Sequence, residues 1–134
     1  MTMVAASAAI VFTLCLLHLV YTFHGPKLLP RDRDLRAQME RSALVLTRET
    51  TVWRAWIGFN ASHSLGGMLF GAVYGYLALW QPGMLAASPF LLAVGAALLL
   101  AYAWLGRRYW FSVPFRGLVL ALLLYAAGVI TTLA

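Results

Sequence analysis

The sequence predicts an all-α integral membrane protein, a four-transmembrane-helix bundle built by a single domain of 134 residues. Two observations lead to this prediction. Hydrophobic residues make up 63% of the chain and charged residues only 10%, and the mean hydropathy is +0.82, whereas soluble domains carry about a quarter charged residues. In addition, a bilayer core of about 30 Å needs roughly 20 apolar residues in a helix. Four segments qualify, at residues 3–23, 56–80, 89–106 and 114–133.

The first span resembles a signal peptide, but we expect it to be retained. No basic residue precedes it, and "HGPK" follows it where a cleavable signal has small residues. The only cysteine, Cys15, lies in this span and excludes an internal disulfide.

The connection between the first two spans predicts a short amphipathic helix at the membrane interface. In "PRDRDLRAQMERSALVLTRET" Asp32 is placed to cap a helix and Asp34 falls in its first turn. Arginines surround apolar residues at near-helical spacing, namely Leu35, Met39, Ala43 and Leu46. Such a helix would lie in the interface with its arginines near lipid phosphates, and a solvated connector is the alternative.

The second span combines polar residues with a ridge of glycines. Asn60, Ser62, His63 and Ser64 stand in its first part, and small residues follow at steps of four, at Gly67, Gly71 and Gly75. This spacing lets a neighbouring helix approach closely. We expect the ridge to pack within the chain, with self-association as the alternative. Ala93, Ala97 and Ala101 add a second small ridge on the third span.

The last two spans have clear boundary signals. "QPG" at 81–83 ends the second span, and Ser88 followed by Pro89 predicts an N-cap and a first helical residue. Gly106, followed by Arg107 and Arg108, predicts a C-cap that ends the third helix. "SVPF" then opens the fourth span.

The distribution of charge predicts the orientation. All ten basic residues lie in two blocks, 27–54 and 107–116, and the loop "QPGMLAAS" contains none. The positive-inside rule places both blocks in the cytoplasm and both termini on the periplasmic side of a bacterial inner membrane. A pI near 10.1 is also typical of nucleic-acid binding, but in this setting anionic lipids are the expected partner and nucleic acid is not.

Polar residues of the first two spans are expected to meet in one layer. His18 and His63 lie at depths that differ by only about 3 Å, at a rise of 1.5 Å per residue, and Asn60 lies one turn closer to the cytoplasm. One interpretation is a hydrogen-bonded clasp that fixes helix register. The other is a cofactor site, in which His18, His63 and Asn60 bind haem or a related tetrapyrrole. Apart from Arg116 in the first turn of the fourth span, the spans contain no Asp, Glu, Lys or Arg, which disfavours an enzyme.

The segment "GRRYWFSVPFR" combines aromatic and basic residues, namely Arg107, Arg108, Tyr109, Trp110 and Arg116. This combination is typical of an anchor at the level of lipid headgroups. A contact surface for another protein subunit is the alternative.

With "FHGPKL", "LTRETTVWRAWIGFNASHSLG" and "RRYWFSVPFRG" in view, the chain resembles an uncharacterised family of small bacterial four-helix integral membrane proteins. "WIGFNASHSLG" is the most specific motif. The resemblance implies a four-span inner-membrane protein and supplies no activity.

These observations favour a small integral membrane protein without catalytic activity. We expect an accessory or structural subunit of a larger membrane assembly, or a homo-oligomer. The alternative is a cofactor- or lipid-binding membrane protein, or a small membrane enzyme, that uses the His/Asn cluster. The sequence predicts no metal site.

Overall fold

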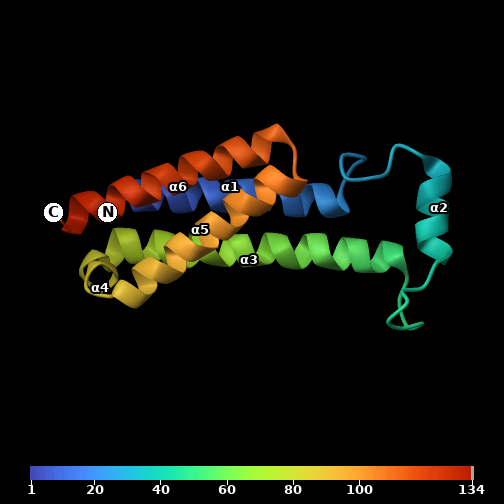
Figure 1. Cartoon of the computed structure of the whole chain (residues 1–134), viewed down its shortest axis with the longest axis horizontal. Coiled ribbons are helices and arrows are strands. Elements are labelled where there is room, and N and C mark those ends of the chain that lie inside the picture. Colours follow the sequence, from blue (N-terminus) through green and yellow to red (C-terminus); the bar gives the residue numbers. More distant parts are fainter. Residues whose placement is uncertain (134) are drawn as a thin grey trace. The chain divides into compact units, whose positions relative to one another are not determined.

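The structure is a computed structural model that describes residues 1–133. These residues form α-helices joined by turns and loops, and no β-strand (Figure 1). The prediction of an all-α fold is therefore confirmed. The helices are α1 (Thr2–Phe23), α2 (Arg33–Arg41), α3 (Val52–Trp80), α4 (Pro82–Ala86), α5 (Pro89–Tyr109) and α6 (Ser112–Leu133).

Three helices of the described chain, α1, α5 and α6, are long and apolar enough to cross a membrane. Helix α3 is the longest at 29 residues, but the polar residues and glycines between Asn60 and Gly75 lower its hydropathy, and it does not qualify on the same measure. The composition of the helices thus indicates a small multi-pass membrane protein.

Several predicted boundaries are confirmed. Helix α1 covers the first expected span, and α6 begins two residues before the fourth. Ser88 is the N-cap of α5, where its Oγ accepts a hydrogen bond from Leu91 N at 3.3 Å and Pro89 takes the first helical position. Asp32 caps α2, because its Oδ1 accepts hydrogen bonds from Asp34 N at 2.8 Å and Leu35 N at 3.4 Å.

The predicted C-cap at Gly106 is wrong, because α5 continues to Tyr109 and Trp110 is its C-cap. Gly106 is buried inside the helix, where a Cβ would lie 3.5 Å from the Phe115 backbone. The glycine therefore allows α6 to approach α5, and it does not terminate the helix.

Other differences concern the connections. The amphipathic helix is shorter than the apolar spacing predicts: α2 ends at Arg41 because Ser42 is extended, and Ala43 forms an isolated antiparallel bridge with Thr51. Leu46 consequently lies in a loop outside the helix. Helix α3 begins at Val52 rather than residue 56, and the unpredicted short helix α4 begins at Pro82, within the "QPG" segment.

The chain divides into two compact units. The first unit contains residues 1–14 and the residues from 67 onward, and the second contains residues 15–66. Helices α1 and α3 contribute residues to both units.

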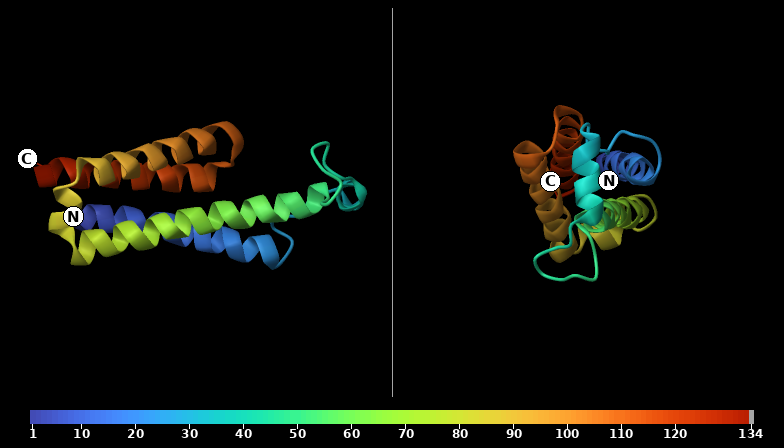
Figure 2. Two further views of the ribbon diagram at one scale, coloured as in Figure 1. Left: turned by 90° about the horizontal axis from the view of Figure 1, so that it is seen from below. Right: turned by 90° about the vertical axis from the view of Figure 1, so that its right-hand side faces the viewer.

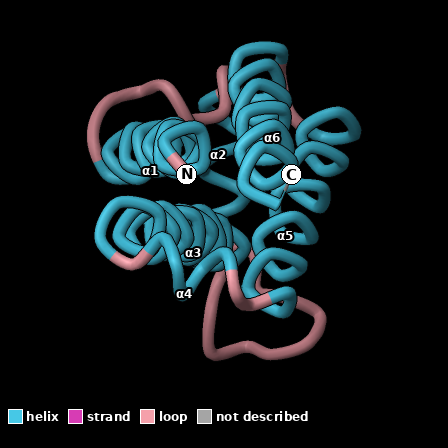
Figure 3. Tube along the Cα trace, turned by 90° about the vertical axis from the view of Figure 1, so that its left-hand side faces the viewer, coloured by secondary structure: helices cyan, strands magenta, loops and turns pink. Residues whose placement is uncertain are grey.

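In the first unit, α5 and α6 contact each other and come together at the turn that connects them (Figures 1 and 2). Segments of α1 and α3 pack beside one another (Figure 3). Buried apolar side chains recur every three or four residues, as expected for helices that turn one face inward. They include Val4, Ala8, Val11, Phe70, Tyr74, Leu77, Leu85, Leu92, Leu99, Leu118, Ala121 and Tyr125. Large apolar residues such as Leu69, Trp104 and Ile130 point outward, which is typical of helices that meet lipid.

The predicted glycine ridge of α3 packs within the chain at Gly71. A Cβ at this position would lie 2.6 Å from Phe12 Cβ and 2.8 Å from the carbonyl oxygen of Ala8, so α1 and α3 are in close backbone contact there. At Gly75 the nearest atom would be Ala8 Cβ, at 3.8 Å. Gly67 is buried. Gly71 and Gly75 therefore differ in how closely α1 approaches them, although the glycines are equally spaced along α3.

A pair of tyrosines joins α3 and α6 to α5 in the same unit. Tyr74 donates its hydroxyl proton to Leu91 O at 2.7 Å, and Tyr125 donates to Leu92 O at 3.0 Å. The two rings meet edge to face with centroids 6.1 Å apart. Buried Gly95 lies against both rings, so the absence of a side chain there makes room for the tyrosines. We call Tyr74, Gly95 and Tyr125 the tyrosine clamp.

Candidate functional site

The predicted polar layer forms inside the second unit. His18 Nε2 and Asn60 Oδ1 are 2.8 Å apart, which joins α1 to α3 through a side-chain hydrogen bond. The imidazole rings of His18 and His63 lie edge to face, with centroids 5.5 Å apart. The structure thus brings together the three residues that the sequence selects as a candidate site.

The hydrogen bonds of Asn60 fix the role of His18. The Asn60 amide nitrogen donates to Trp56 O at 2.8 Å, one turn earlier in α3. Its oxygen is therefore the atom that faces His18, and an amide oxygen only accepts. It follows that His18 Nε2 carries the proton of this bond, and a neutral His18 has its lone pair on Nδ1.

Two hydroxyl groups complete the layer through local bonds. Thr22 Oγ1 donates to His18 O at 2.8 Å, and Ser64 Oγ donates to Asn60 O at 2.9 Å. Both Thr22 and Ser64 are buried, as is Cys15. Hydroxyls that bond to the carbonyl four residues earlier are satisfied without an external partner, so these residues shape the layer and His18 and Asn60 connect its two helices.

This geometry matches the clasp interpretation. A hydrogen bond between side chains contributes about 1 kcal/mol, and leaving one partner buried and unpaired costs more. Haem or a related tetrapyrrole would need a nitrogen lone pair of the histidine directed at the iron. Because His18 Nε2 donates to Asn60, tetrapyrrole binding through that nitrogen requires this bond to break.

The aromatic-basic segment lies where α5 turns into α6, in the first unit. Arg107, Arg108, Tyr109 and Arg116 are exposed, and the Arg108 guanidinium lies 5.9 Å from the centre of the Tyr109 ring. Trp110 is half-buried and meets Tyr102 edge to face at 6.2 Å. The cations and Tyr109 thus face outward, while Trp110 packs on α5.

Sequence analysis missed the tyrosine clamp. Gly95 stands outside any regular small-residue ridge, and a hydropathy plot does not show which helix a mid-span tyrosine faces. The available signal was chemical, because a hydroxyl inside hydrocarbon needs a partner and a glycine on the facing helix provides room for the ring.

No protein-family model matches the sequence, and no match was found among curated proteins or solved structures. The family resemblance drawn from "WIGFNASHSLG" stays a prediction.

Proposed function

We propose that the chain is a non-enzymatic accessory or structural subunit of a larger assembly in a bacterial inner membrane, or a homo-oligomer there, with four spans and both termini periplasmic. The apolar outward faces of α1, α5 and α6 support membrane insertion. The observation that favours a structural role is the hydrogen-bonded clasp, in which His18 and Asn60 satisfy each other between two helices.

The distribution of charge supports α3 as the fourth span. If only α1, α5 and α6 crossed the membrane, the basic blocks 27–54 and 107–116 would lie on opposite sides. With α3 as an additional span they share one side, as the positive-inside rule requires. Helix α3 is also long enough, since 29 residues at about 1.5 Å each reach roughly 43 Å.

Cysteine labelling tests this topology. In a Cys15→Ala background, Gln81→Cys is expected to react with a membrane-impermeant maleimide in intact spheroplasts, whereas Glu49→Cys is expected to react only after permeabilisation. Both positions are exposed and flank α3, and labelling in denaturant controls for reactivity. Equal labelling of the two positions would show that α3 does not cross the membrane, and the reverse pattern would overturn the sidedness.

The alanine ridge of α5 supports association with another membrane helix. Ala93, Ala97 and Ala101 are all exposed, while Leu92, Gly95 and Leu99 on the same helix turn inward. Small outward residues at steps of four permit close backbone approach, which drives association where lipid supplies no hydrophobic force between helices.

Native mass spectrometry of the protein, extracted from its own membrane in mild detergent, tests the functional proposal. We expect a stoichiometric protein partner or a defined oligomer. Ala97→Leu should weaken that association by about tenfold, or about 1.4 kcal/mol, because the larger side chain separates the helices. Ala126→Leu, at an exposed position of α6, is the matched control and should leave it unchanged. A clean monomer contradicts the proposal, and a stoichiometric tetrapyrrole mass would favour the cofactor alternative.

A further inference from the structure

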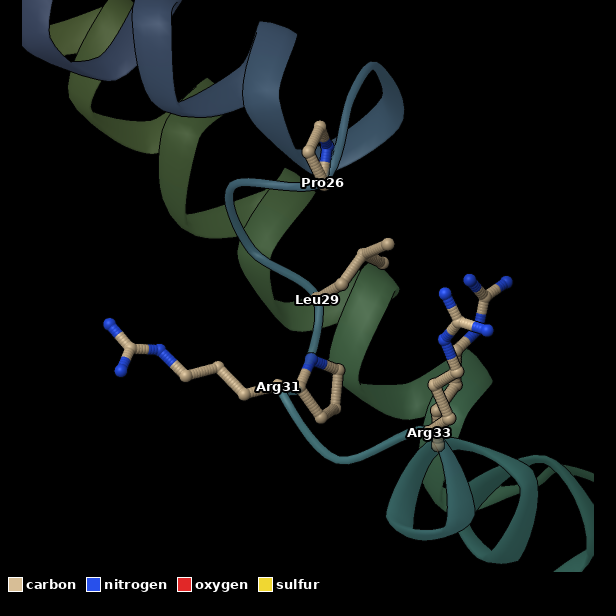
Figure 4. Close-up of a pocket in the computed structure, with 6 residues that line it drawn as sticks. Pro26, Leu29, Arg31 and Arg33 are labelled. Carbon is tan, nitrogen blue, oxygen red and sulfur yellow. The ribbon is translucent and has the colours of Figure 1, made fainter.

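A shallow pocket lies in the second unit, between the end of α1 and the start of α2. It is lined by Pro26, Leu29, Pro30, Arg31, Arg33 and Arg36. Figure 4 shows Arg33 on the same side of the loop as Leu29, while the Arg31 side chain extends in the opposite direction. Guanidinium groups therefore flank a small apolar surface.

The acidic residues of this region leave those guanidinium groups available. The Asp32 carboxylate is engaged with the N-terminus of α2, and Glu40 pairs with Arg36 Nε at 2.9 Å. That pair is exposed, so it contributes little, and it leaves the remaining donors of Arg36 for another acceptor. Within residues 1–133 neither Arg31 nor Arg33 forms an ion pair, and Asp34, the remaining acid of α2, pairs with neither of them.

Helix α2 has too little internal support to be stable in water. It is nine residues long and buries none of them, whereas isolated helices shorter than about 12 residues are marginal. Apolar Leu35 is exposed on it. Contact of Leu35 with an apolar surface outside the described chain would stabilise this helix.

The surroundings indicate that this surface is a membrane interface. Lys27 Nζ lies 3.9 Å from the centre of the Tyr21 ring, and the Arg36 guanidinium lies 5.0 Å from the centre of the Trp53 ring. Aromatic rings combined with cations at the ends of membrane helices are typical of the headgroup level. The segment also connects α1 directly to α3.

We propose that this pocket binds the phosphate headgroup of an anionic phospholipid. Arginine matches phosphate geometry with paired N–H donors. Arg33 and Arg36 hold the phosphate, and Leu29 and Pro26 contact the glycerol and first methylene groups. The inference rests on the membrane placement proposed above and adds a ligand class and a site to it.

The test uses the full chain in detergent, titrated with phosphatidylglycerol and, in parallel, with phosphatidylcholine, and measured by native mass spectrometry. The Arg33→Gln, Arg36→Gln double variant should bind the first phosphatidylglycerol at least tenfold more weakly, without a change for phosphatidylcholine. Its fold should persist, because the pair between Arg36 and Glu40 is exposed and contributes little to stability. Arg41→Gln with Arg48→Gln removes the same charge from exposed positions outside the pocket and should change the affinity by less than twofold.

Equal losses in the two double variants would show that only the overall charge of the segment matters, and this would overturn the site. Unchanged binding in the first variant would also overturn it. Displacement of phosphatidylglycerol by millimolar inorganic phosphate would show a site for soluble anions and not for lipid. Release of the chain from membranes by alkaline carbonate would overturn the membrane placement and the site together, whereas the preceding outcomes leave the membrane placement intact.

Discussion

Replacing Gly71 with alanine is expected to destabilise the protein by about 3 kcal/mol, in the range of overpacking in a closely packed interior. The added Cβ would lie 2.8 Å from the carbonyl oxygen of Ala8 and 3.1 Å from Phe12 Cα. Because these are backbone atoms of α1, no rotation of a side chain relieves the clash, and α1 must move away from α3. Gly71→Leu should prevent the monomer from folding.

Gly75→Ala is the matched control for this prediction, because it makes the same substitution one turn later on the same ridge. Its Cβ would make an ordinary contact with Ala8 at 3.8 Å. Alanine also favours a helix by about 0.5–1 kcal/mol over glycine, so this variant should be neutral or slightly more stable. Both are measured as unfolding free energies in mixed micelles, followed by far-ultraviolet circular dichroism. An intact Gly71→Leu monomer that loses only an oligomer would show that the ridge serves self-association.

The contrast between Gly71 and Gly75 illustrates how far sequence reasoning extends. Spacing places Gly67, Gly71 and Gly75 on one face of α3, and hydropathy locates the ends of α1, α5 and α6 to within three residues. Spacing cannot show where two helix axes approach most closely, because that depends on crossing geometry. The C-cap prediction at Gly106 failed for a related reason. A glycine can end a helix, but it can also let a neighbouring helix approach, and Gly106 does the latter for α6.

The candidate site was predictable because helical rise is regular. Counting residues from a common membrane surface places His18 near His63 and Asn60, and the structure joins His18 to Asn60. The direction of the Asn60 amide was not predictable, because the choice of Trp56 O as its partner is a local detail of α3. The pocket at Arg31 and Arg33 was also missed, since it depends on the path of the loop before α2.

Gly95→Ala should destabilise the protein by about 2–3 kcal/mol through the tyrosine clamp. The new Cβ would overlap the Tyr125 hydroxyl and lie 2.7 Å from Tyr74 Cε1, so both rings must shift and their hydrogen bonds to Leu91 O and Leu92 O weaken. Unfolding free energies in mixed micelles measure the effect. Gly58→Ala is the control, because a Cβ there meets open space on exposed α3 surface and should stabilise the helix slightly.

A double variant separates this clash from a general loss of glycine flexibility. Tyr125→Phe alone should cost about 1 kcal/mol, the contribution of one hydrogen bond. Combined with Gly95→Ala, it removes the oxygen that the new methyl group meets first. The double variant should therefore lose about 1 kcal/mol less unfolding free energy than the two single variants lose together. The rescue is expected to be partial, because the contact with Tyr74 remains. Strictly additive losses would show that Gly95 matters for a reason other than the Tyr125 hydroxyl, and a neutral Gly95→Ala would show that α5 does not depend on the clamp for its position.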